Sequence, residues 1–246
     1  MRFSTLVIAA VTAAVLVRAE PAVAVVWPDV PERVARALTA PDPTTRRMAA
    51  QELSTLGRAR GTPLVLQALG DADIEVKLAA AQSAIRLRVA PATSAVLPWL
   101  GDREARLRVS ACEVARALPD ARTISQLARA LGDADATVRA AAADALGAQA
   151  SPDAVAPLLG RLDDPSPQVR VQIARALARL GDLRAVVPLV GKVQDSVVDV
   201  RQAVVRALGE LGDPRASQAL ILTLRDNANE VRIESLHALG RLRAAE

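Results

Sequence analysis

The stretch DDPSPQVRVQIARALARLGD, residues 163–182, contains an order of residues that recurs along the whole chain. Within it, Asp164 stands six positions before Arg170, and Leu177 and Leu180 follow the arginine by seven and ten positions. The same order returns at a fixed interval of 31 residues. A period of roughly 20 to 50 residues indicates a stack of similar units rather than a single globular core.

Aligned at this period, the chain has one basic and one acidic column, which together we name the ladder. The basic column is filled in seven repeats by Arg46, Lys77, Arg108, Arg139, Arg170, Arg201 and Arg232. The acidic column is filled in six by Asp71, Asp102, Asp133, Asp164, Asp195 and Asp226, and Ala40 stands at the first position. We expect each aspartate to lie at the start of a helix, to accept N–H groups of its first turn, and to meet a guanidinium of its own or the adjacent repeat. The ladder is therefore predicted to be structural rather than to bind a ligand.

The apolar residues recur at steps of three and four, which indicates helices. Each repeat is predicted to hold two of them, for example a first helix at 185–193 and a second helix at 200–211. Left-handed C-cap residues are expected after second helices at Gly57, Gly181 and Gly212. Small residues, Cys112 among them, fill the columns that face neighbouring repeats and allow close helix packing. The sequence predicts an all-α, right-handed α-solenoid of about seven helix pairs over residues 25–246.

Two stretches, DDPSPQVRVQIARALARLGD and DADATVRAAAADALG, resemble HEAT repeats of the short kind that also occurs in phycobilisome lyase subunits. The resemblance covers residues 30–243 and implies the same solenoid fold. That repeat is shared by scaffolds, lyases, hydroxylases and nucleic-acid enzymes, so it implies no single activity.

Residues 1–24 have a different character from the repeats. Arg2 is followed by fifteen uncharged residues and then by the small residues of Ala22-Val23-Ala24. This layout is typical of a secretory signal peptide, and the apolar run is shorter than the about 20 residues of a membrane span. We predict export to the periplasm or the medium, with cleavage after Ala24 or Ala19 and no stable membrane span afterwards. An uncleaved anchor and a misplaced start codon are the alternatives.

Residues for catalysis and for nucleic-acid binding are scarce. HEAT-like hydroxylases carry several His-Glu pairs as iron ligands, whereas the one histidine of this chain, His237, precedes Ala238. We therefore predict no metal, no cofactor and no enzymatic activity. A net charge of +4, with no Tyr and one Phe, also argues against nucleic acid as a partner. A phycobilin-lyase-like or chaperone-like subunit that holds a modified protein is the alternative function, and the secretory start argues against it.

The surface offers two candidate protein-binding regions. The columns five and nine positions after the basic column lie opposite the buried stripe of the second helices, which are expected to line the concave side. In the later repeats these columns are basic, through Arg175, Arg179, Arg206, His237 and Arg241. They form either a merely solvated face or a groove for an acidic segment of another protein.

The second region is Trp99, which stands in a column of the first helices that otherwise appears exposed. This side chain is expected either to cover the loop around Pro91 or to anchor a partner on the convex side. The predicted function is that of an exported, non-enzymatic protein–protein interaction scaffold.

Overall fold

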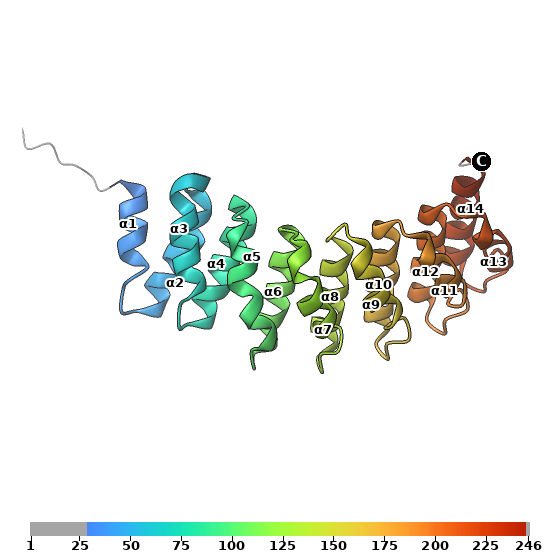
Figure 1. Ribbon diagram of the computed structural model, residues 1–246, viewed down its shortest axis with the longest axis horizontal. Helices are drawn as coiled ribbons and strands as arrows, with labels where there is room; N and C mark the ends of the chain where they lie inside the picture. The colour runs from blue at the N-terminus through green and yellow to red at the C-terminus, as the bar shows by residue number, and fades with distance from the viewer. Residues whose placement is uncertain (1–28, 245–246) are drawn as a thin grey trace, which may run out of the picture.

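The computed structural model describes residues 29–244, which form seven helix pairs packed side by side along one axis (Figure 1). No strand occurs in these residues. The predicted all-α solenoid of about seven helix pairs is therefore confirmed. The proposed signal peptide, residues 1–24, lies outside the described residues. Among the helices of 29–244, none is both long enough and apolar enough to cross a membrane.

The helices alternate between two classes. The first helices are α1 (Val30–Ala37), α3 (Arg58–Leu69), α5 (Pro91–Val96), α7 (Ile124–Ala130), α9 (Val155–Leu159), α11 (Val186–Val190) and α13 (Ser217–Thr223). The second helices are α2 (Pro43–Glu52), α4 (Ile74–Leu87), α6 (Ala105–Ala117), α8 (Ala136–Gly147), α10 (Pro167–Leu180), α12 (Val198–Leu211) and α14 (Asn229–Ala244). Single 3₁₀ turns extend them at η1 (Leu53–Thr55), η2 (Leu97–Gly101), η3 (Ala121–Thr123), η4 (Pro152–Ala154), η5 (Leu183–Ala185) and η6 (Pro214–Ala216).

Burial follows the repeat pattern. In α10, Val169, Ile173 and Leu177 lie one turn apart and are fully buried, which is the expected inward stripe. Neighbouring second helices touch through small residues: a Cβ added to Gly147 of α8 would lie 2.7 Å from the Cβ of Ala176 in α10. The apolar core extends along the stack in two clusters that meet at α6.

The helix ends match the sequence pattern at two of three glycines. Gly181 and Gly212 end α10 and α12 with φ of 66° and 68°, in the left-handed region that glycine adopts without strain. The prediction for Gly57 is wrong. Its φ is −61° and its backbone is extended, because α2 continues into η1 and Gly57 is the N-cap of α3.

The prediction that Trp99 stands on an exposed outer position is also wrong. Trp99 lies in η2, is 7% exposed and belongs to the N-terminal core cluster. Ala68 and Ala130, its equivalents in other repeats, are buried as well. The last turn of a first helix therefore faces the core in these repeats, and Trp99 does not present a convex binding site.

Candidate functional site

The ladder joins successive repeats through bidentate ion pairs. The Arg139 guanidinium donates from Nε and Nη2 to the two carboxylate oxygens of Asp164, at 2.7 and 2.9 Å. Its Nη1 donates to the carbonyl of Asp133, the acidic residue of its own repeat, at 2.9 Å. Each such arginine thus ties the loop of its own repeat to the loop of the next. Arg108, Arg170 and Arg201 form the same three contacts, and Arg46 does so with the carbonyl of Ala40 in place of an aspartate carbonyl.

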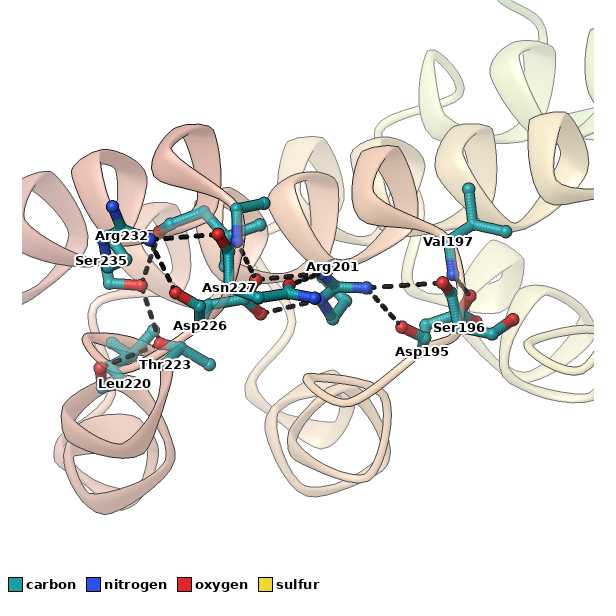
Figure 2. A network of polar contacts seen from close by, with 12 residues as sticks. Asp195, Ser196, Val197, Arg201, Leu220, Thr223, Asp226, Asn227, Arg232 and Ser235 are labelled. Atoms are coloured by element: carbon teal, nitrogen blue, oxygen red, sulfur yellow. Dashed lines mark hydrogen bonds and ion pairs between the residues drawn. The ribbon is translucent and has the colours of Figure 1, made fainter.

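Figure 2 shows this arrangement at Arg201, whose guanidinium lies between the loops that carry Asp195 and Asp226. Hydrogen bonds from Arg201 lower the pKa of the Asp226 carboxyl, and burial opposes that shift. The side chains of both residues are 9% exposed. The carboxylate is therefore held ionised in a mostly buried pair.

The aspartates of the acidic column were predicted to lie at the starts of the second helices, but each lies two residues before the N-cap of its helix. Asp164 accepts the backbone N–H of Ser166 at 2.9 Å, and Ser166, not Asp164, is the N-cap of α10. The same shift is seen at Asp71 and Asp73, of which Asp73 caps α4. The column therefore orders the loop before each second helix, and it does not cap the helix as expected.

Two positions of the ladder differ from the rest. At Lys77, no bidentate pair reaches Asp102, which accepts only the backbone N–H of Glu104 at 2.8 Å. Within the described residues, the Lys77 ammonium has neither an ion pair nor a hydrogen bond. At the last repeat, Arg232 donates to the carbonyls of Asp226 and Asn227. A lysine cannot reproduce the planar two-pronged contact of a guanidinium, which accounts for the gap at Lys77.

A second set of pairs runs along the starts of the first helices, and sequence reasoning missed it. Arg184 pairs with Asp182 and donates from Nη2 to the carbonyl of Pro152 in the previous repeat, at 3.1 Å. Arg215 makes the equivalent contacts one repeat later. An Asp-x-Arg order at the 31-residue period was the signal available in the sequence. The hydrogen bond from Arg184 lowers the pKa of Asp182 to about 2.

The face formed by the second helices contains hollows near both ends of the stack. We name the hollow lined by α2, α4, α6 and the start of α8 the N-terminal groove; its volume is about 950 Å³. Two smaller hollows of about 370 and 530 Å³ share residues of α10 and α12, and together we name them the C-terminal groove. The predicted binding residues Arg175 and Arg206 line both parts of the C-terminal groove, and Arg179 lines one.

Most of the predicted basic residues on this face already have partners within the chain. Arg179 pairs with Asp144. Arg206 and Arg241 both pair with the buried carboxylate of Glu234, at 2.7 and 3.0 Å. Burial raises the pKa of Glu234, but hydrogen bonds from these two arginines lower it overall, so its charge offsets theirs. Of the predicted set, Arg175 and His237 are exposed and form no ion pair within residues 29–244.

The remaining chemical groups are few. Cys112 is fully buried, and burial raises the pKa of its thiol to about 12. Across residues 29–244, no three His, Cys, Asp or Glu side chains are grouped as metal ligands would be.

Comparisons with known proteins agree with this geometry. Many solved structures are similar to the chain, and the following three match it over most of its length. YibA of Escherichia coli matches with a TM-score of 0.64 and 20% identity, over 87% of this chain and 82% of that one. The complex of CpcE and CpcF of phycocyanin lyase from Nostoc matches with a TM-score of 0.55 and 20% identity, over 86% and 94%. A designed armadillo repeat protein in complex with the peptide (KR)4 matches with a TM-score of 0.50 and 20% identity, over 87% and 99%.

At this level of identity these similarities establish the fold alone. No curated protein sequence matches the chain. The family profile of HEAT repeats matches residues 30–102, 93–166 and 157–240. Together these matches span nearly all of the described residues, and the chain therefore belongs to the HEAT-repeat family.

Proposed function

We propose that the protein is an exported, non-enzymatic scaffold that binds other proteins along the face of its second helices. The observation that carries the proposal is the pair of grooves on this one face, which together are lined by residues from α2 to α12. Extended grooves formed by stacked repeats suit long segments of a partner.

Proteins of similar architecture support a binding role. CpcE and CpcF form a complex with each other, and the designed armadillo protein was solved with a bound peptide. Export rests on the sequence of residues 1–24. The lyase-like alternative draws no specific support from the geometry, since the likeness to CpcE and CpcF extends only to the fold.

Site-specific photo-crosslinking in the native host tests the binding face. A photoreactive amino acid is placed at Gln82 or Gln172 on the second-helix face, and at the exposed Gln218 on a first helix as a matched control. We expect discrete crosslinked protein bands from the first two positions and none from Gln218. Crosslinks from Gln218 alone would place binding on the other side and refute the proposal.

The export part needs a separate measurement on the same cells. Mass spectrometry of the purified protein should find a chain that starts at Val25 or, with the earlier cleavage site, at Glu20. An intact Met1 on protein recovered from the cytoplasm would contradict export.

A further inference from the structure

The N-terminal groove has an ordered layout that the sequence prediction did not assign to any ligand. Its middle row is formed by Gln51 of α2 and Gln82 of α4, at equivalent positions of successive repeats, and by Glu113 of α6. Arg47 lies toward the start of α2, and Arg86 lies toward the end of α4. Their repeat positions differ by eight residues, or about 12 Å along a helix axis. Over α2 and α4 the groove thus has an arginine on each rim and an uncharged middle row, whereas Glu113 and Asp135 add negative charge over α6 and the loop before α8.

Arg47 and Arg86 have no ion-pair partner within the described residues, although the hydrogen bond from Arg106 and, to a smaller extent, Arg47 lower the pKa of Glu75. Both of these rim arginines are exposed. The third arginine of the groove, Arg106, is paired with Glu75 at 2.7 Å. In the C-terminal groove, by contrast, Arg179 and Arg206 are already paired. The capacity to bind an acidic partner therefore lies mainly in the N-terminal groove, where carboxylates would gain partners without displacing internal ones.

The middle row suits a polypeptide backbone. A glutamine carboxamide offers both a donor and an acceptor, as a peptide group does. The carboxamides of Gln51 and Gln82 are exposed and form no hydrogen bond within the described residues. Leu78 and Val109, both half-buried, add apolar surface to the lining. In an extended chain, successive side chains point to opposite sides, so two adjacent acidic residues would reach the two rims.

Resting on the proposed scaffold function, we infer that the N-terminal groove binds an extended acidic segment of another protein. Its backbone lies over the carboxamides of Gln51 and Gln82, and neighbouring carboxylates pair with Arg47 and Arg86. Glu113 continues the middle row on α6 and repels carboxylates there. The acidic residues of the partner therefore lie over α2 and α4, and a neutral or basic portion lies over α6.

Fluorescence anisotropy with defined peptides tests this inference on the folded chain. The probe is a fluorescein-labelled dodecapeptide of three Ala-Ala-Glu-Glu units, and its neutral counterpart carries glutamine in place of glutamate. We expect the acidic peptide to bind at least about ten-fold more tightly at low salt, with the difference shrinking as salt is raised. The double variant Arg47→Glu/Arg86→Glu should lose this preference. Arg47→Gln/Arg86→Gln, a milder change, should lose most of it, and thermal melts would establish that both variants are folded.

The control is Arg129→Glu/Arg225→Glu, which changes the net charge by the same amount at two exposed residues that line neither groove. It should bind the acidic peptide as the wild type does. The inference is overturned if neither peptide binds, if both bind equally, or if the groove variants retain the preference. If the control loses binding as well, the peptide responds to overall charge and this inference fails, while the scaffold proposal is tested separately by the crosslinks from Gln82 and Gln172.

Discussion

Replacing Asp164 with Ala removes one rung of the ladder from a central repeat. The substitution deletes both carboxylate contacts of Arg139 and the hydrogen bond from the Ser166 N–H. The Asp164 side chain is only 2% exposed, and the Arg139 side chain is 11% exposed. Breaking a buried pair by removing one partner costs about 3–5 kcal/mol, whereas an exposed pair contributes below about 1 kcal/mol.

In this variant the Arg139 guanidinium still donates hydrogen bonds to the carbonyls of Asp133 and Ala134, so its charge remains partly compensated. We therefore expect a loss of about 3 kcal/mol in the free energy of unfolding. For a domain of this size, that corresponds to a fall of about 6–12 °C in Tm. Chemical denaturation followed by circular dichroism measures the first quantity, and calorimetry measures the second.

Asp102→Ala is the matched control, because Asp102 occupies the same column with a loop hydrogen bond and no bidentate pair. It should cost only about 1 kcal/mol, the value of one hydrogen bond. Asp164→Asn, which keeps the acceptor for Ser166, should fall between the two alanine variants. Equal losses for Asp102→Ala and Asp164→Ala would refute the reasoning, since the ion pair would then contribute nothing beyond the loop contact.

Three further predictions follow from burial and packing. Because hydrogen bonds from Arg201 depress the pKa of Asp226 in the folded state, the unfolded chain takes up protons first as pH falls. The contribution of the Asp226 carboxylate to the free energy of unfolding should be fully present above about pH 4 and be lost as the pH falls through the folded-state pKa. A urea midpoint that stays constant from neutral pH to about pH 3 would contradict this. The thiol of Cys112, with a pKa raised to about 12 by burial, should react with an aromatic disulfide reagent at neutral pH only after denaturant is added, so rapid labelling of the native chain would be inconsistent with its burial. Gly147→Ala should lower the free energy of unfolding by about 1–3 kcal/mol, because the added Cβ would overlap the next second helix. Gly240→Ala, in the same column with no atom within 4 Å of the added Cβ, should leave the free energy of unfolding unchanged or raise it by up to about 1 kcal/mol. Similar thermal melts for the two variants would rule out the proposed overlap.

The fold could be predicted because a repeat imposes the same environment on equivalent positions. Once Leu177 is recognised as part of a helical stripe, the residues at the same place in other repeats are assigned too, and most of them are buried. The register of the ladder could also be read from the spacing. The direction of pairing, from Arg139 forward to Asp164, depends on how consecutive loops stack, and the spacing alone left both directions open.

The wrong prediction for Trp99 and the missed pairing of the basic residues have one physical cause: the residue types in a column do not show which side chains lie beside that column in the fold. Ala68 and Ala130 suggested an exposed position for Trp99, yet small residues are equally suited to tight packing. The basic binding residues of the later repeats were predicted from like charges in two columns. Glu234, which pairs with Arg206 and Arg241, stands in a third column. The N-terminal groove was missed because Arg47 and Arg86 belong to different columns, and what distinguishes them is that neither forms an ion pair within the described residues.

The missing rung at Lys77 has a consequence for how the chain opens. A bidentate ladder arginine ties each of the other five junctions between successive repeats. At this junction, α1–α4 are joined to the rest of the stack by packing contacts and by the exposed ion pair between Arg106 and Glu75. Backbone amides of these four helices should therefore exchange with deuterated water through a shared partial unfolding that requires less free energy than global opening. The N-terminal groove spans α4 and α6, on both sides of this junction. A segment bound there would contact both sides of the junction and stabilise α1–α4 against local unfolding. Slower amide exchange throughout α1–α4 would show that it is bound.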